Sequence, residues 1–226
     1  MSDQVAALEA RLAQLEDRLT RAEDIEAVRK LQYQYGYYLD KTYYEEVVEL
    51  FADREDTRVH FLHGVFHGKA GAQRLYTGRF MTKFADGHNG PRYGRLLDHP
   101  QMQGVITLSE DGQSARGRFR SLMSAGNHET VEGFRQWWEG GVYENEYVKV
   151  DGQWRIKVLN FRSLWQGQFD QGWSKAPVEY AGYLTDTYPD DPHGPDEIVD
   201  DWGMFPRTET VPFHYDHPVT GNPVTD

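Results

Sequence analysis

The sequence predicts an α+β fold in which helices pack on one face of a curved sheet. Three observations lead to this prediction. Apolar residues recur at steps of three and four between residues 25 and 39, which is the period of an amphipathic helix. Turn signals at 110–112 (Glu-Asp-Gly) and at 151–152 (Asp-Gly) each separate two strand-like runs. Helical segments come first and antiparallel strands follow, an order typical of α+β domains.

The predicted elements can be placed in order along the chain. Helices are expected at 25–40 and 44–51, a strand at 57–66, a helix at 70–80, a glycine-rich loop at 86–95, a first hairpin of strands 103–108 and 114–123, and a second hairpin of strands 142–150 and 154–161. In the last strand Trp154, Ile156 and Val158 alternate with basic residues, which indicates a half-buried strand.

The N-terminal segment, residues 1–23, carries a heptad pattern. Its apolar residues follow one another at spacings of 3, 4, 3, 4 and 3, and they are Val5, Leu8, Leu12, Leu15, Leu19 and Ala22. Charged residues fill the positions between them. Two interpretations stay open: an amphipathic helix lying on its own domain, or self-association through the apolar seam. The second makes a homo-oligomer, a dimer or a trimer, the expected assembly.

Net charge divides the chain into three parts. The total is −12, but residues 28–173 contribute only +1, with 18 acidic and 19 basic residues, whereas residues 174–226 contribute −9. This C-terminal part also holds eight of the ten prolines, together with many aromatic residues. We therefore expect one domain at 24–173 and, at 174–226, an extended acidic arm that packs over the domain or over a neighbouring subunit, with a disordered tail as the alternative.

Composition excludes several classes of function. The acidic balance argues against binding the nucleic acid backbone, which needs a basic face. With no cysteine, the chain has no disulfide, no thiolate metal site and no catalytic thiol. No signal peptide or long apolar run is visible, so a cytoplasmic protein without membrane contact is expected.

No metal or cofactor site is predicted. His60, His63 and His67 lie close together in the sequence, but spacings of three and four suit ligands on a helix, and this stretch is predicted as a strand. Phosphate-binding glycine loops and nucleophile elbows are absent from the sequence. Carboxylate, imidazole and phenol groups are therefore the candidates for chemistry.

Asp40 and His99 are the main candidates for acid–base catalysis. Asp40 ends the first long helix after a run of tyrosines, and Tyr37 lies three residues before it on what we expect to be the same helix face. A carboxylate buried against aromatic rings has a raised pKa and can act as a base near neutral pH. His99 enters the strand that leads to the first hairpin. For Asp40 a helix-capping role, and for His99 a purely structural role, remain the alternatives.

Four motifs in the same order resemble the nuclear transport factor 2-like superfamily, in particular its SnoaL-like and scytalone dehydratase-like branch. They are YQYGYYLDKTYYEEVVELFAD at 33–53, GVFHGKAGAQRLY at 64–76, HPQMQGVITLSEDGQSARGRFRS at 99–121 and YENEYVKVDGQWRIKVLNFRSLW at 143–165. The resemblance covers 24–173. It implies a cone-like fold, with a curved mixed sheet wrapped around a deep apolar pocket that the N-terminal helices close.

The resemblance also implies roles for individual residues. Asp40 and His99 fall on positions where scytalone dehydratase-like enzymes keep a catalytic aspartate and histidine. Leu39 replaces a water-binding tyrosine, for which Tyr37 or Tyr38 can substitute, and Tyr143 replaces an asparagine, so scytalone itself is not the expected substrate. The predicted site is therefore catalytic Asp40, His99 and Tyr37, with substrate-binding residues His60, Tyr143, Tyr38 and Trp138.

Members of this superfamily carry out cofactor-free reactions on hydrophobic ring compounds. The C-terminal VPFHYDHPVTGNP and the WEGGVYEN run resemble a subgroup that includes diarylpropane γ-formaldehyde lyases, which release formaldehyde from lignin-derived dimers and leave a stilbene. The resemblance therefore implies a cofactor-independent lyase acting on a small aromatic molecule. The alternatives are a dehydratase or isomerase of a polyketide- or steroid-like substrate, and a non-catalytic binding module or accessory subunit.

Overall fold

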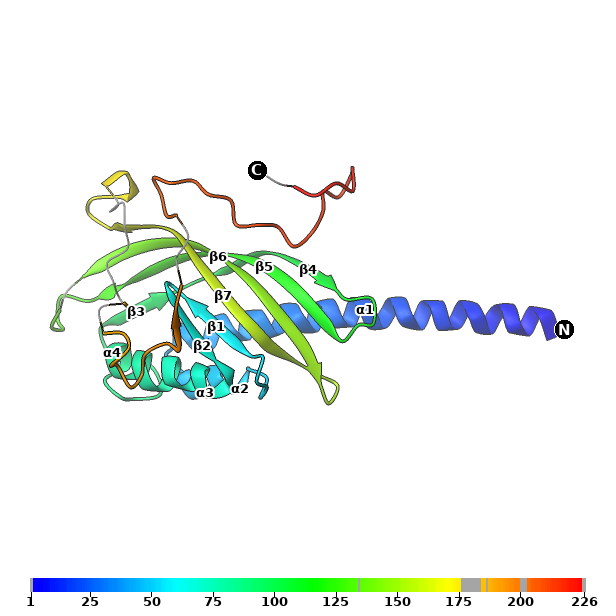
Figure 1. Ribbon diagram of the computed structural model, residues 1–226, viewed down its shortest axis with the longest axis horizontal. Helices are drawn as coiled ribbons and strands as arrows, with labels where there is room; N and C mark the ends of the chain where they lie inside the picture. The colour runs from blue at the N-terminus through cyan, green and yellow to red at the C-terminus, as the bar shows by residue number, and fades with distance from the viewer. Residues whose placement is uncertain (1, 134, 176–183, 186, 200–202, 225–226) are drawn as a thin grey trace.

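A computed structural model describes residues 2–133, 135–175, 184–185, 187–199 and 203–224 of the chain. Helices and a mixed sheet form two layers (Figure 1). The helices are α1 (Ser2–Asp40), α2 (Tyr44–Glu49), α3 (Gly68–Gln73), the π-helix η1 (Arg74–Phe80), α4 (Met81–Ala85) and the short 3-10 helix η2 (Trp173–Lys175). The strands are β1 (Arg58–Phe61), β2 (Gly64–His67), β3 (Arg95–Asp98), β4 (Gln101–Leu108), β5 (Ser114–Asn127), β6 (Gln136–Val150), β7 (Gln153–Gln168) and β8 (Glu197–Ile198).

The sheet has the strand order β3-β5-β6-β7-β1-β2-β8, and β4 pairs with β5 beside β3. All pairs are antiparallel except β1 with β7, which are parallel. The long strands β5, β6 and β7 curve over α2, α3 and α4, which lie together on one side of the sheet (Figure 1). This arrangement confirms the predicted α+β fold, and both predicted hairpin turns, at 110–112 and 151–152, are present.

The core lies between the helices and the concave face of the sheet. Tyr44, Tyr76, Phe119 and Tyr147 are completely or almost completely buried there. Aromatic rings make edge-on contacts across the layers, as between Tyr35 of α1 and Tyr143 of β6, whose centroids are 5.9 Å apart. The high aromatic content of the sequence is therefore concentrated where the sheet bends around the helices.

Helix α1 is continuous from Ser2 to Asp40, so the heptad segment and the first domain helix form one rod. Its residues 3–20 are all exposed, and Figure 1 shows this part projecting beyond the β4–β5 turn. The heptad segment thus does not lie on its own domain. Within the described part of the chain, no helix is both long and apolar enough to cross a membrane.

Three predicted elements differ from the structure. The expected strand 57–66 is a hairpin of β1 and β2, because Leu62 takes a positive φ of 52° and reverses the chain. The predicted helix at 70–80 continues through η1 and α4 to residue 85. The expected loop at 86–95 ends in β3, a strand that the sequence did not predict and that pairs with the end of β5.

Two parts of the acidic C-terminal segment contact the domain, while residues 176–183, 186, 200–202 and 225–226 lie outside the described residues. Asp191 pairs with the buried Arg79 of η1, and Asp196 pairs with Arg74 and accepts a bond from the His67 amide. Farther along, Arg118 of β5 donates to the carbonyl of Val211 at 2.7 Å. The described parts of the arm are therefore held by arginines of the domain.

A buried amide cluster joins α1 to the sheet. The Gln32 side chain is completely buried; its Oε1 accepts bonds from the Tyr147 hydroxyl at 2.7 Å and the Asn145 amide at 2.9 Å. Gln32 Nε2 in turn donates to Gln101 Oε1 at 2.7 Å. Because the side chains of Gln32, Asn145 and Tyr147 are buried away from water, each needs its hydrogen-bond partner.

Replacing Gln32 by leucine should destabilise the fold. Two buried donors lose their acceptor, at about 1–3 kcal/mol each, so we expect the free energy of unfolding to fall by about 2–4 kcal/mol. Chemical denaturation followed by circular dichroism measures this change. Gln34→Leu is the matched control, because Gln34 is exposed on the same helix. Equal stability of the two variants would contradict the role given to the cluster.

Candidate active site

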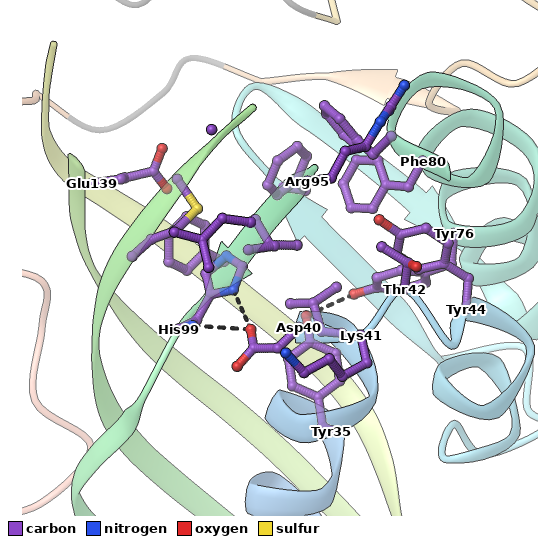
Figure 2. A pocket seen from close by; sticks show the side chains of 18 of the residues that line it. Tyr35, Asp40, Lys41, Thr42, Tyr44, Tyr76, Phe80, Arg95, His99 and Glu139 are labelled. Atoms are coloured by element: carbon purple, nitrogen blue, oxygen red, sulfur yellow. Dashed lines mark hydrogen bonds and ion pairs between the residues drawn. The ribbon is translucent and has the colours of Figure 1, made fainter. Parts of the chain in front are cut away.

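Asp40 and His99 form a hydrogen-bonded pair at the junction of α1 and β4. Asp40 Oδ1 lies 2.7 Å from His99 Nδ1 and also accepts the His99 backbone amide at 2.9 Å (Figure 2). Their side chains are only 11% and 9% exposed. Because a carboxylate accepts hydrogen bonds, the contact places the proton of a neutral imidazole on Nδ1 and leaves Nε2 as an acceptor.

The local sequence explains this contact. The buried stripe of α1 runs along Val28, Leu31, Tyr35 and Leu39, and Asp40 follows it at the last helical position. A Cβ on Gly36 would lie 2.7 Å from the Gln101 side chain, so glycine allows α1 to approach the start of β4 closely. That approach brings the Asp40 carboxylate within reach of His99.

The pair opens onto a cavity of about 200 Å³ between the helices and the sheet. Its walls are mostly aromatic and aliphatic, and they include Leu39, Phe61, Phe80, Phe84, Met123, Trp137, Leu159 and Phe161. In Figure 2, Asp40 and His99 lie on one side of the cavity, and Tyr76 and Phe80 lie on the other. A small hydrophobic molecule would therefore meet mostly apolar walls, with the Asp40–His99 pair as one polar corner and further polar groups, such as Arg95 and Glu139, elsewhere in the wall.

Four tyrosines line the same cavity, and Tyr35, Tyr76 and Tyr143 lie close to one another. The Tyr35 and Tyr76 hydroxyls lie 3.0 Å apart, and the Tyr143 ring packs against Tyr35. Burial raises the pKa of each of these phenols above its ordinary value. They therefore stay neutral at physiological pH, as hydrogen-bond donors and not as bases.

Glu139 of β6 is a second buried carboxyl group in the cavity wall. It is 6% exposed, and Gln166 Nε2 donates a bond to its Oε2 at 3.0 Å. Burial raises the pKa of Glu139 to about 7. Near neutral pH a large fraction of this group therefore carries a proton that it can donate. In the view of Figure 2, Glu139 and Asp40 lie on opposite sides of the His99 ring.

The structure brings three of the predicted site residues together. Asp40, His99 and Tyr143 all line the cavity. Tyr37 does not: its side chain is 75% exposed, because it lies about 200° around the helix from both Tyr35 and Leu39 of the buried stripe. The expectation that it shares the functional face with Asp40 is therefore wrong. Tyr38 is half-buried and lines a separate surface cleft beside α2.

His60, a predicted substrate-binding residue, does not line the cavity, whereas its neighbour Phe61 does. Successive side chains of β1 point to opposite faces of the sheet, and the cavity side belongs to Phe61. His60 has a buried Nδ1 without a hydrogen-bond partner, and its pKa is lowered mainly by burial and further by Arg162 and Arg58. It remains neutral on the other side of the sheet.

The same alternation corrects the prediction for Trp138. Tyr143 faces the cavity, and counting back in steps of two along β6 leads to Glu139 and Trp137, not to Trp138. Trp138 instead stacks on Phe169 with centroids 5.8 Å apart. The alternation of side chains along β6 could therefore have identified Glu139 from the sequence. Glu139 lies four residues before Tyr143 and so on the same face of the strand.

The histidines that cluster in the sequence lie on β1, β2 and the turn between them. His67 pairs with Glu197 at 2.6 Å, whereas His60 and His63 belong to β1 and its turn. Within the described residues, no three His, Asp or Glu side chains gather in a way that could hold a metal ion.

Comparison with known proteins identifies the family. Residues 20–160 match the SnoaL-like domain, so the chain belongs to the SnoaL-like domain family. This match spans α1 from Thr20 through the first half of β7, and it includes Asp40, His99 and Glu139. A search of curated proteins found no match.

Solved structures share the fold at low sequence identity. A candidate scytalone dehydratase from Novosphingobium aromaticivorans DSM 12444 is 23% identical with a TM-score of 0.52, covering 72% of this chain and 97% of its own. A type 2 hexachlorocyclohexane dehydrochlorinase (LinA) is 19% identical with a TM-score of 0.51, covering 74% and 97%. The type 3 LinA of Novosphingobium barchaimii LL02 is 19% identical with a TM-score of 0.52, covering 69% and 94%. These likenesses establish the fold alone.

The raised pKa of Glu139 has a measurable effect on stability. An unfolded glutamate titrates near its ordinary value of 4.5, so between that pH and about 7 the folded chain binds a proton that the unfolded chain has lost. Stability should therefore decrease as pH rises through this window, by about 3 kcal/mol in total. Glu139→Gln removes the effect. Its stability relative to the wild type should rise by about 2–3 kcal/mol from pH 5 to pH 8.

Denaturant titrations of the wild type and Glu139→Gln at each pH measure this difference. Glu55→Gln, at an exposed position, serves as the control and should track the wild type throughout. If the two variants show the same pH dependence, Glu139 does not titrate with a raised pKa.

Proposed function

We propose that this protein is a lyase that acts by acid–base chemistry on a small hydrophobic aromatic molecule, without a cofactor. The observation that carries the proposal is the Asp40–His99 pair at the wall of an aromatic cavity. The names of the dehydrochlorinases and the candidate dehydratase that share the fold both describe eliminations, in which a base removes a proton. The same fold thus supports reactions of this type.

His99 is the general base in this proposal, and Asp40 positions it. Asp40 holds the imidazole through Nδ1 and through the backbone amide, so Nε2 is directed away from the carboxylate. Nε2 has no hydrogen-bond partner among the described residues, and it is free to accept a proton from substrate. The imidazolium that forms is stabilised by the adjacent carboxylate.

Glu139 is the general acid. Its protonated form persists near neutral pH because burial raises the pKa of the carboxyl group more than the hydrogen bond from the Gln166 amide lowers it. Because their surroundings differ, His99 can accept a proton from one substrate oxygen while Glu139 donates a proton to another. The buried phenols of Tyr35, Tyr76 and Tyr143 add neutral donors that can bind substrate hydroxyls.

The specific reaction that we propose is formaldehyde release from a lignin-derived 1,2-diarylpropane-1,3-diol. His99 removes the proton of the terminal hydroxyl, whose oxygen forms the C=O bond of formaldehyde as the adjacent C–C bond breaks. The electrons of that bond form the C=C bond of a stilbene. The benzylic hydroxyl leaves with the Glu139 proton as water, so no oxidant or reductant is needed. Two aryl rings suit the aromatic walls of the cavity.

A simpler elimination is the second candidate. The same base and acid can remove water from, or isomerise, a polyketide- or steroid-like ring compound without breaking a C–C bond. The candidate dehydratase among the fold neighbours favours this reaction. A non-catalytic binding module is less favoured, because it does not require a buried carboxylate–imidazole pair or a buried protonated carboxyl group in its cavity.

Removing the base should abolish most of the activity. His99→Gln and Asp40→Asn should each reduce kcat for a diarylpropanediol by about 10²–10⁴-fold, because proton transfer loses its acceptor or the acceptor loses its orientation. Released formaldehyde and the stilbene absorbance measure the rate. Asp98→Asn, at an exposed neighbouring position, is the matched control and should keep near-wild-type activity.

The outcomes separate the candidate functions. Near-full activity of correctly folded Asp40→Asn would refute the catalytic pair. Turnover of ring alcohols by the wild type without formaldehyde from any diarylpropanediol would favour the dehydratase. Saturable binding of aromatic ligands with no turnover would favour the binding module.

Activity should also depend on the protonation of Glu139. Because the pKa of this group is about 7, the proposed acid is lost as pH rises above that value, and kcat should decline on the alkaline side. Glu139→Gln should lower kcat by about 10²-fold and should remove this limb from the pH profile. A wild-type alkaline limb that persists unchanged in Glu139→Gln would show that another group titrates.

A further inference from the structure

The N-terminal part of α1 presents an apolar face that the domain does not cover. Five large aliphatic side chains are between 50% and 63% exposed, and they are Val5, Leu8, Leu12, Leu15 and Leu19. A single helix standing in water gains no stability from such a face, because most helical stability in proteins comes from packing an amphipathic face against a partner. A row of exposed aliphatic residues on one side of a free-standing helix is typical of an interaction surface.

The spacing of these residues specifies the kind of surface. Val5, Leu12 and Leu19 occupy a positions of a heptad, and Leu8 and Leu15 occupy d positions, with Ala22 in the last d position. Strict a/d spacing forms the narrow seam of a coiled coil, whereas a helix that packs on a globular core needs a wider stripe. The occupant that fits is therefore another helix with the same repeat.

The charges beside the seam specify orientation. The g positions are Arg11 and Arg18, and the e positions are Glu9, Glu16 and Glu23. In a parallel, in-register pair each g residue faces the e residue five positions later on the other helix, so Arg11 meets Glu16 and Arg18 meets Glu23. In an antiparallel pair g faces g and e faces e, which sets arginine against arginine and glutamate against glutamate.

We infer that residues 5–22 form a parallel, in-register coiled coil with the same residues of a second copy of this chain. The seam is exposed, its heptad spacing matches itself, and its flanking charges are complementary only in the parallel arrangement. This inference does not rest on the proposed function.

The domain leaves room for this assembly. Arg21, next to the end of the seam, donates to the carbonyls of Ser109 and Glu110 in the β4–β5 turn, both at 3.3 Å. The domain thus begins to contact the helix only where the seam ends. Figure 1 shows β3 and α4, which contribute to the cavity wall, at the opposite end of the molecule.

Cross-linking of the full chain tests orientation. The chain has no cysteine, so a single Val5→Cys substitution introduces one reactive thiol. In the parallel arrangement two copies place these thiols side by side, and mild oxidation should convert most of the Val5→Cys chain to a covalent dimer. An antiparallel pair instead brings position 5 near position 22. Cross-linking only in a mixture of Val5→Cys and Ala22→Cys chains would overturn the parallel register.

Substitution in the seam tests the surface itself. The double variant Leu12→Glu/Leu19→Glu places charges at two a positions and should reduce the mass measured by light scattering. Ala6→Glu/Ala13→Glu adds the same charges at outward-facing b positions of the same helix and should keep the wild-type mass. Equal masses for both variants, or a wild-type mass of 26.2 kDa, the mass of one chain, would overturn the inference.

Discussion

The bond between the Asp40 carboxylate and His99 is the contact on which the candidate site depends. One oxygen, Asp40 Oδ1, accepts both the backbone amide and the imidazole Nδ1 of the same residue, so it joins the end of α1 to the start of β4 and fixes the histidine ring. The close approach that makes this possible requires glycine at position 36. The carboxylate that orients the His99 ring therefore also holds a helix against the sheet.

The Asp40–His99 pair lies in a cavity whose walls also shift the pKa values of neighbouring side chains. Burial keeps the phenols of Tyr35 and Tyr143 neutral and raises the pKa of Glu139 toward neutrality. The effect follows from the same aromatic walls that would bind a hydrophobic substrate, because they exclude water. An apolar cavity therefore supplies both affinity for rings and a carboxyl group that can act as an acid at pH 7.

Much of the fold could be predicted from the sequence, whereas the site could be predicted only in part. Helical period and Asp-Gly turns are local signals, and they located α1 and both long hairpins. The two turn residues, Leu62 and His63, are neither glycine nor proline, so Gly64 after them was the one local signal that could have divided β1 from β2. Strand β3 pairs with the far end of β5, and a pairing between segments distant in the sequence leaves no local signal. The directions of side chains were predicted least well. Tyr37 lies on the opposite face of α1 from the buried stripe, and His60 and Trp138 are each one position away from a residue that lines the cavity.

The uneven charge of the chain has a structural explanation that follows from these contacts. The domain is nearly neutral because it carries arginines that pair with the arm as well as with its own carboxylates: Arg79 binds Asp191, and Arg74 binds Asp196. At the other end, the parallel pair that we infer sets Arg11 and Arg18 against Glu16 and Glu23 of the second helix. Arginines of the domain thus offset part of the acidity of the C-terminal arm, whereas two copies of the N-terminal segment each keep their net negative charge. Among the described residues, neither the paired charges of the arm nor the charges beside the heptad seam line the cavity, whose own ionisable groups include Asp40, Arg95 and Glu139.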